Sequence, residues 1–380
     1  MFLCIKGAEV YAPEYQGKAD VLVCNEKVIH IAPQIETSVL PGQVKVIQAE
    51  GLKLLPGLID QHVHITGGGG ESGFTSRVPE LRFSQIIEAG VTTLVGLLGT
   101  DSHTRDIRNL VAKTKALNEE GVTAYCLTGA YALPSPTLTG SVGDDIAFIQ
   151  EVIGVKVAIS DHRSMCPSRE ELAKLAAEAR LAGLVSGKVG EVHMHTGVGK
   201  DGLKTILDIV ETTDIPIKHF RPTHMRKISE ADAVKFSQLG GYVDYTSGEQ
   251  PLEQAQVIME ALEAGVPAAR LTISSDSNGS MPKWGKNKEL IGITYARMTS
   301  LWQQICALVQ KGMPLEQALS FVTSNVAQAL EIYPQKGCIA EQSDADMILI
   351  NERMEIRFVI AKGKLLMEEG KVLKKGFFEE

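Results

Sequence analysis

Two histidines one residue apart, His62 and His64, end an apolar run in the segment GLIDQHVHITGGGGE, residues 57–71. Side chains two positions apart on a β-strand point to the same face, so both imidazoles can reach one metal ion. The alternative is a pair of polar residues that leave a core strand for solvent. The pair alone supports the two interpretations about equally, and the rest of the chain must distinguish them.

Further polar residues end or interrupt the apolar runs that follow. Each of them alone has an ordinary structural role, as a core or rim side chain or as a helix N-cap. Together they supply nitrogen and oxygen donors of the kind that divalent metals bind. These residues are Tyr131, Lys156, His195, His224 and Asp276.

Lys156 lies inside the apolar segment IGVKVAISD. Burying an unpaired ammonium is costly, so an ordinary explanation is a lysine that reaches the rim or pairs with an acid. Beside several histidines a second explanation is available, because burial favours the neutral amine. A neutral amine can add carbon dioxide and become a carbamate, which has two oxygens that can bridge metals.

The elements that must position these residues repeat at intervals of about 30 residues, as expected for βα units. Eight apolar runs begin at residues 58, 91, 122, 155, 191, 219, 242 and 271. Amphipathic stretches separate them, such as residues 168–183, with Ser168 as N-cap and Gly183 as the end. We predict an α/β fold with a TIM-like (β/α)8 barrel, whose strand ends would meet at one mouth. An open doubly wound sheet is the alternative, but no G-x-G-x-x-G follows the first run.

The two ends of the chain have a different pattern, with short strand-like runs separated by turn residues. Neither end has enough apolar faces to close a core alone, so we predict one small β-sandwich built from residues 1–55 and 333–380. The barrel would then comprise residues 56–332. Two helices are predicted before the C-terminal flank, within residues 287–312 and 314–332.

Composition is that of a globular protein, with 44% hydrophobic and 22% charged residues. The net charge of −8 and the absence of a basic block argue against nucleic acid as a partner and favour a small substrate. No run approaches the roughly 20 apolar residues of a membrane span, and no signal peptide is recognised. The scattered cysteines indicate no disulfide framework, so a cytoplasmic location is expected.

With these residues in place, the chain resembles the amidohydrolase superfamily. The features that carry the resemblance are H-x-H at the first strand, a lysine in the fourth, histidines ending the fifth and sixth, and an aspartate ending the eighth. Within that superfamily the segments DQHVHITGGGGE, GLLGTDS, LTGAY, GVKVAISDHR and SSDSNGS are similar to the isoaspartyl dipeptidase family. The likeness extends over nearly the whole chain.

This resemblance implies a binuclear zinc hydrolase that cleaves β-aspartyl (isoaspartyl) dipeptides into aspartate and an amino acid. His62, His64 and Asp276 would hold one Zn²⁺, and His195 and His224 the other. A carbamate on Lys156 would bridge the two ions together with a hydroxide, which attacks the side-chain amide carbonyl. Asp276 would also transfer protons, and Tyr131 would donate a hydrogen bond to the oxyanion.

The resemblance also implies the contacts to the dipeptide. Glu71 would bind the α-ammonium of the isoaspartyl residue, and its α-carboxylate would be held by Thr100, Ser280 and the backbone of Gly69. Arg163 would bind the carboxylate of the leaving residue. The ordinary alternatives are a flexible glycine loop and a surface ion pair for Arg163.

One position departs from the family pattern, which has a second arginine three residues after the sixth-strand histidine. Here Lys227 occupies that position, and Arg226 precedes it. Either can supply positive charge, but a lysine cannot reproduce the bidentate geometry of a guanidinium. The remaining histidines match no ligand position and are interpreted as structural or surface residues: His30, His103, His162, His193 and His219.

Two other interpretations of the function stay open. One is a cyclic-amide hydrolase of the same superfamily, such as a hydantoinase or a dihydroorotase, which would not need Glu71 as an ammonium partner. The other is a non-catalytic scaffold that keeps the fold without the metals. A homo-oligomer is expected by analogy with the family.

Overall fold

Strands and helices alternate through the middle of the chain. The computed structural model describes residues 2–284 and 290–379, apart from the side chains of Lys227, Pro282, Trp284 and Leu290. Each of the eight predicted runs contains a strand: β6 (Leu58–Val63), β7 (Val91–Gly96), β8 (Thr123–Gly129), β9 (Val152–Ile159), β10 (Glu191–Thr196), β11 (Phe220–Thr223), β12 (Val243–Thr246) and β13 (Leu271–Ser274). The helices between them are α1 (Phe83–Glu88), α2 (Ile107–Glu120), α3 (Val142–Phe148), α4 (Arg169–Ser186), α5 (Lys204–Thr212), α6 (Glu230–Gln238) and α7 (Pro251–Glu263).

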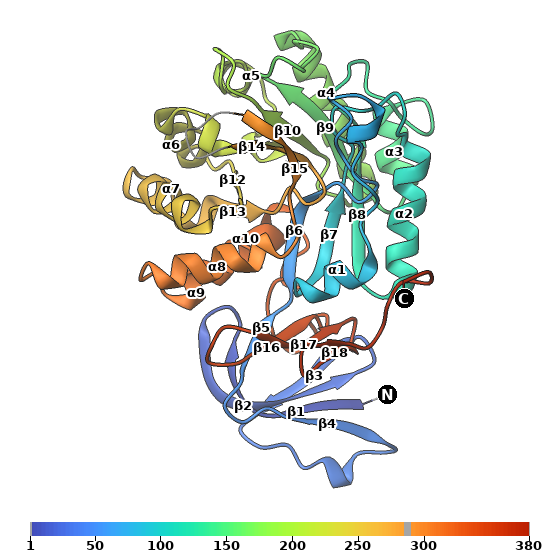
Figure 1. Cartoon of the computed structure of the whole chain (residues 1–380), viewed down its shortest axis with the longest axis vertical. Helices are drawn as coiled ribbons and strands as arrows, with labels where there is room; N and C mark the ends of the chain where they lie inside the picture. Colours follow the sequence, from blue (N-terminus) through green and yellow to red (C-terminus); the bar gives the residue numbers. More distant parts are fainter. Residues whose placement is uncertain (1, 285–289, 380) are drawn as a thin grey trace.

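Six of these strands form one parallel sheet in the order β11-β10-β9-β8-β7-β6, and β12 and β13 form a parallel pair. A parallel bridge between Val63 and Ser277 joins the end of β6 to the segment after β13. The sheet is curled, with helices on its outer side (Figure 1). The predicted α/β class is confirmed. Because the strands are parallel, their carboxyl ends lie at the same edge, where the predicted site residues are found.

The strands are apolar runs because they are covered on both faces. Every residue of β6, β7, β9 and β10 is buried. Parallel strands between helices have no face open to water, so β9 is almost wholly apolar, whereas β10 alternates between buried polar and buried apolar side chains. Polar side chains inside such strands need buried partners, and Lys156 and His193 are both fully buried.

Helix α4 begins as predicted but ends later. The Ser168 hydroxyl accepts a hydrogen bond from the Glu171 amide, and the Glu171 side chain accepts from the Ser168 amide, which forms a capping box. The predicted end at Gly183 is wrong, because the helix continues to Ser186 and ends at Gly187, whose φ of 69° is left-handed. Gly183 lies against Gly190 instead, where a Cβ would come within 2.8 Å of the Gly190 backbone.

Both termini contribute to one nine-stranded sheet of mixed parallel and antiparallel pairs. Its strands are β1 (Phe2–Tyr11), β2 (Tyr15–Cys24), β3 (Lys27–Ala32), β4 (Val44–Gln48), β5 (Lys53–Pro56), β16 (Met347–Ile350), β17 (Ile356–Ala361), β18 (Lys364–Glu368) and β19 (Lys371–Val372). The antiparallel pair of β5 with β16 joins the two ends of the chain, with Leu54 opposite Leu349. This terminal sheet lies beside α1 and the strands next to it (Figure 1), and Ile348 and Val359 pack in the same apolar cluster as Ile86 and Ile87.

The segment before the C-terminal flank differs from the prediction. One helix is predicted over residues 287–312, of which 287–289 lie outside the described residues. In the described part, Leu290–Tyr295 forms the strand β15, which pairs with β14 (Ser280–Trp284), and only α8 (Ser300–Gln310) is helical. Ile291, Ile293 and Tyr295 alternate along β15, a period-two pattern of β-favouring residues that outweighs the helical interpretation. The second predicted helix is divided into α9 (Leu315–Ser320) and α10 (Ser324–Ala329).

Short 3₁₀ turns complete the elements: η1 (Thr37–Val39), η2 (Phe74–Ser76), η3 (Ile217–His219), η4 (Met225–Lys227) and η5 (Ala268–Arg270). Among the described residues, no helix has both the length and the apolar character needed to cross a bilayer.

Candidate metal centre and active site

A cavity of about 300 Å³ opens at the carboxyl ends of the parallel strands. Most of the predicted site residues line it: His64, Gly69, Glu71, Thr100, Tyr131, Arg163, His195, His224, Arg226, Asp276 and Ser280. His62 and Lys156 lie beneath its surface and are 1% and 0% exposed. Residues from distant parts of the sequence thus meet in one place.

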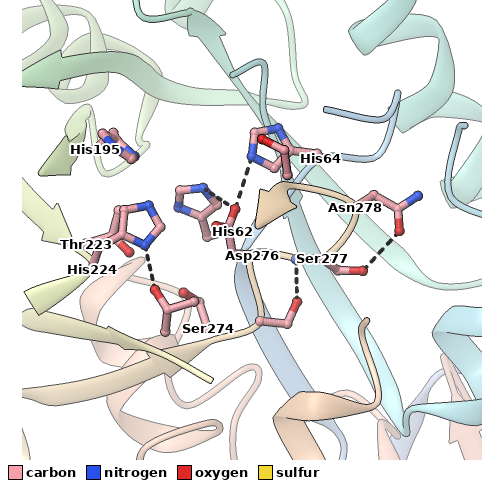
Figure 2. Close-up of polar contacts among 12 residues, drawn as sticks. His62, His64, His195, Thr223, His224, Ser274, Asp276, Ser277 and Asn278 are labelled. Carbon is pink, nitrogen blue, oxygen red and sulfur yellow. Dashed lines mark hydrogen bonds and ion pairs between the residues drawn. The ribbon is translucent and has the colours of Figure 1, made fainter. Parts of the chain in front are cut away.

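His62, His64 and Asp276 form a compact group on one side of this cavity. Oδ1 of Asp276 lies 3.3 Å from Nε2 of His62 and 3.1 Å from Nε2 of His64. Figure 2 shows both imidazoles directed at this carboxylate. Asp276 follows β13 in a left-handed conformation with φ 54°, which is uncommon for a non-glycine residue and frequent at functional sites.

The protonation states in this group suit a cation. Burial lowers the pKa of His62 well below its ordinary value, so its imidazole is neutral, the form that binds metals. Burial alone would raise the pKa of Asp276, but its interactions with His62 and His64 outweigh that effect and hold the pKa well below the ordinary range. Ligand atoms of His62, His224 and Asp276 all lie within 4.8 Å of one another. His62, His224 and Asp276 could therefore hold a metal ion, although the sequence resemblance assigns His224 to the second ion.

His195 and His224 come from the ends of β10 and β11. Their ring centroids lie 4.6 Å apart, and that of His224 lies 5.2 Å from His62. His224 has a left-handed backbone with φ 63°, and its Nδ1 lies 2.6 Å from the Thr246 hydroxyl. Nε2 of His195 lies 2.9 Å from Oδ2 of Asp161. A neighbouring polar group therefore fixes the orientation of each ring.

Lys156 is enclosed below the histidines. Its Nζ lies 3.5 Å from Nε2 of His62. The side chain has no exposed surface, so it does not reach the rim of the cavity, which was one of the ordinary explanations. Burial lowers the pKa of Lys156 to about 7, despite the opposing effect of Asp276, so much of the amine is neutral near that pH.

A chain of buried side chains supports His62 from behind. Nδ1 of His62 lies 2.9 Å from Nε2 of His193, and Nδ1 of His193 lies 3.2 Å from Oε1 of Glu191. Arg221 donates from Nε to the other Glu191 oxygen at 3.1 Å. Engagement of Nδ1 directs Nε2 of His62 toward Asp276 and Lys156.

The sequence prediction missed this chain, although the alternation in EVHMHT places Glu191, His193 and His195 on one face of β10. Among the histidines assigned no ligand role, His193 and His219 are buried, consistent with a structural role, and His30, His103 and His162 are exposed.

The predicted substrate-binding residues gather around one carboxylate. Oε1 of Glu71 accepts hydrogen bonds from the hydroxyls of Thr100 at 3.2 Å and Ser280 at 2.8 Å. Arg163 NH1 lies 3.4 Å from the same oxygen. Gly69, with φ 75°, approaches Ser76 so closely that a Cβ would lie 2.4 Å from the Ser76 carbonyl oxygen.

Tyr131 lies between this group and the histidines. Its ring centroid is 4.6 Å from that of His195, and the Arg163 guanidinium carbon lies 5.5 Å from the ring centre. Burial raises the pKa of Tyr131 well above its ordinary value, so the hydroxyl keeps its proton and can donate it in a hydrogen bond.

Arg226 and Lys227 follow His224 in η4. Arg226 lines the cavity, and its NH1 donates to the Gln254 side-chain oxygen at 3.4 Å. The side chain of Lys227 lies outside the described part of the chain, so its predicted contact with the leaving residue stays a prediction.

Comparison with known proteins places the chain in a family. Residues 54–366 match the model of the amidohydrolase family. The crystal structure of a beta-aspartyl dipeptidase from Fervidobacterium islandicum AW-1, in complex with beta-Asp-Leu dipeptide, is 43% identical, with a TM-score of 0.92 over 99% of this chain and 100% of that one. Dihydropyrimidinase from Brevibacillus agri NCHU1002 shares the fold at 18% identity, with a TM-score of 0.68 over 99% of this chain and 97% of that one.

Curated relatives are more distant. A dihydroorotase from Streptococcus thermophilus is 24% identical over 92% of this chain and 90% of its own length. An adenine deaminase from Geobacillus kaustophilus is 22% identical over 96% of this chain, which spans only 60% of that protein. Taken together with the site geometry, these matches show that the chain belongs to the amidohydrolase family and is similar over its full length to a beta-aspartyl dipeptidase.

Proposed function

We propose that this protein is a binuclear zinc isoaspartyl dipeptidase, which hydrolyses β-aspartyl dipeptides to aspartate and an amino acid. The observation that carries the proposal is the cluster around Glu71, where Thr100, Ser280 and Arg163 meet beside the histidines. One carboxylate with neighbouring hydroxyls matches the ammonium and carboxylate that an isoaspartyl residue carries on its α-carbon. The full-length likeness to a beta-aspartyl dipeptidase supports this assignment.

The metal ligands in this proposal are the residues predicted from the sequence. His62, His64 and Asp276 would hold one Zn²⁺, and His195 and His224 the second. Lys156, as a carbamate, would bridge the two. Neutral imidazoles and carboxylate oxygens fit zinc, and amidohydrolases are generally metal-dependent. Two ions bound there would polarise the scissile carbonyl and lower the pKa of the attacking water.

The protein's own residues would carry the remaining steps. The anionic Asp276 carboxylate would accept the proton of the attacking water and return it to the amine that leaves. The Tyr131 hydroxyl, which keeps its proton, would donate to the carbonyl oxygen as negative charge develops there. Arg163, with Arg226 or Lys227, would bind the carboxylate of the leaving residue.

The architecture proposed with this function is a (β/α)8 barrel over residues 56–332, formed by β6 to β13. The terminal sheet, from residues 1–55 and 333–380, would be a separate β-sandwich domain. We also propose a homo-oligomer, by analogy with the family.

A cyclic-amide hydrolase is the second candidate, favoured by the dihydroorotase match at 24% identity. One comparison distinguishes the two activities: turnover of β-Asp-Leu, α-Asp-Leu and a hydantoin, measured side by side with metal-loaded protein. An α-aspartyl dipeptide places its ammonium one bond closer to the reacting carbon, so its charges would go partly unpaired. We expect β-Asp-Leu to be preferred by about 10³-fold or more in kcat/KM.

Comparable rates on the two dipeptides, or preference for the hydantoin, would contradict the dipeptidase assignment. Metal analysis of the same preparation tests the non-catalytic alternative. Protein that binds no metal and hydrolyses none of the three compounds would be a scaffold.

A further inference from the structure

Asp161 contacts both halves of the site, although nothing in the sequence pattern assigned it a role. It follows β9, the strand that carries Lys156, by two residues, and its side chain is 6% exposed. Oδ2 lies 2.9 Å from Nε2 of His195 and 3.0 Å from NH2 of Arg163. Oδ1 accepts from Nε of Arg163 at 2.9 Å and from the Arg163 amide at 2.8 Å.

Local backbone geometry holds Asp161 in this place. Ser160 has a left-handed conformation, with φ 52°, that turns the chain at the end of β9. The chain after β10 passes so close that a Cβ at Gly197 would lie 2.5 Å from Oδ2 of Asp161. Glycine is therefore required there for the carboxylate to reach His195, and the ends of two strands together define its position.

The contacts of Asp161 constrain each partner in a specific way. Nε2 of His195 lies 2.9 Å from the Asp161 carboxylate and 3.2 Å from NH2 of Arg163. Because the carboxylate is the nearer group and can only accept, its contact favours the tautomer with the ring proton on Nε2 and the lone pair on Nδ1. On the arginine, the carboxylate occupies the edge formed by Nε and NH2 in a bidentate pair. The NH1 end of Arg163 is left directed toward Glu71 and the cavity.

We propose that Asp161 is a positioning residue that sets the tautomer of His195 and the placement of Arg163 together. The same carboxylate would then support zinc binding through His195 and recognition of the leaving residue's free carboxylate through Arg163. This inference rests on the proposed dipeptidase function for its second half. It predicts a linked defect, in which one substitution weakens metal retention and substrate selectivity at once.

The test compares Asp161→Asn with Arg163→Met, which removes only the guanidinium. Zinc affinity is measured by competition with a chromogenic chelator. Kinetics are measured on β-Asp-Leu and on β-Asp-leucinamide, whose leaving residue has no carboxylate. Thermal melting of each metal-loaded variant checks the fold.

We expect Arg163→Met to lose the preference for β-Asp-Leu over the amide, mainly through KM, while its zinc affinity falls much less than that of Asp161→Asn, because the Asp161 contact with His195 is kept. Asp161→Asn should lose the same preference and also bind zinc about 10- to 100-fold more weakly. Wild-type zinc affinity in Asp161→Asn would overturn the proposal, and so would an unchanged preference for the free carboxylate.

A second variant, Gly197→Ala, covers the case in which Asp161→Asn does not fold. Its added Cβ would lie 2.5 Å from Oδ2 and 2.6 Å from Cβ of Asp161, and 2.6 Å from the Ser160 carbonyl oxygen. It therefore shifts Asp161 together with its backbone and keeps the carboxylate, so both defects should appear in weaker form. A folded Gly197→Ala protein with only one of the two defects would contradict the link. Failure of the proposed function is distinguishable, because wild-type protein would then ignore β-Asp-Leu while the zinc competition still separates the variants.

Discussion

The two halves of the cavity are built in different ways. The candidate metal ligands lie at the ends of buried strands, and neighbouring groups fix the rings of His62, His195 and His224 from behind. The candidate substrate contacts come largely from loops. Glu71 follows a glycine run and lies in an exposed turn, where its main partners are other side chains of the same cavity.

The loop half is held by backbone hydrogen bonds, such as that from Gly68 N to the Asn278 carbonyl oxygen at 2.8 Å, and by one buried arginine. Arg105, 8% exposed, donates to the carbonyl oxygens of Thr66, of Gly68 at 3.0 Å and of Val78 at 2.9 Å. Thr66 directly precedes the glycine run and Gly68 lies within it. Val78 follows Arg77, which forms an antiparallel bridge with Gly69. The comparison indicates that the sheet positions the candidate metal ligands, whereas the loop that would provide selectivity depends on backbone hydrogen bonds and on one buried side chain.

The largest effect is expected at the centre of the buried half. Lys156→Ala should lose metal and activity together, because alanine cannot form the carbamate that is proposed to hold both ions. Metal content and turnover of β-Asp-Leu are measured on the same preparation. Added short carboxylic acids with excess zinc should restore part of both.

Restoration by a carboxylic acid is the control for misfolding in Lys156→Ala, since an unfolded protein would not respond. Full metal content with normal turnover in this variant would exclude a bridging role for Lys156.

Asp276→Asn should have the next largest effect. The amide cannot accept the proton of the attacking water, so kcat should fall by at least about 10²–10⁴-fold, the range typical of general acid–base catalysis. Zinc content, measured in parallel, separates a loss of proton transfer from a loss of metal. Near-normal kcat would mean that another residue transfers the proton.

In the loop half, Glu71→Gln should reduce kcat/KM for β-Asp-Leu by about 10- to 100-fold, the value of one charged hydrogen-bonding partner. Metal content should stay unchanged, because the Glu71 carboxylate contacts Thr100, Ser280 and Arg163, which are not candidate metal ligands. Glu352→Gln, at an exposed glutamate in a distant turn, is the matched control. Loss of zinc from Glu71→Gln would show that the two halves are not separate.

The contrast between the metal ligands at the strand ends and the substrate contacts on loops also decides what can be predicted from the sequence. The strands of the parallel sheet were located because fully buried strands are apolar runs, and polar residues at their ends stand out. The sequence therefore singles out His62, His64, His195, His224 and Asp276, and the structure places them together. The strand β15 was missed because its period-two pattern is short and precedes a true helix.

The groups that support the site were harder to predict. Asp161 and His193 contact candidate ligands on other strands, and Arg105 donates to backbone carbonyls of a distant loop. A contact of this kind leaves no periodic signal, since it depends on how two strand ends or loops meet in space. His193 had a local signal in the alternation of β10, whereas Arg105 had none.

The smallest effect is expected from Arg105→Lys, which tests whether the loop half is held as the comparison suggests. A lysine keeps the positive charge but has a single nitrogen, so it cannot reach the carbonyls of Thr66, Gly68 and Val78 together. The glycine run should then sample other positions, and Glu71 would be less often in place to bind the substrate ammonium. We expect KM for β-Asp-Leu to rise by about 10-fold, with kcat and zinc content near the wild-type values, since one or two hydrogen bonds of modest net value are lost. Steady-state kinetics and zinc analysis of Arg105→Lys, beside the exposed control Arg108→Lys, make the measurement. A fall in kcat with loss of zinc would mean that Arg105 supports the histidine cluster as well, and that the two halves of the cavity share one scaffold.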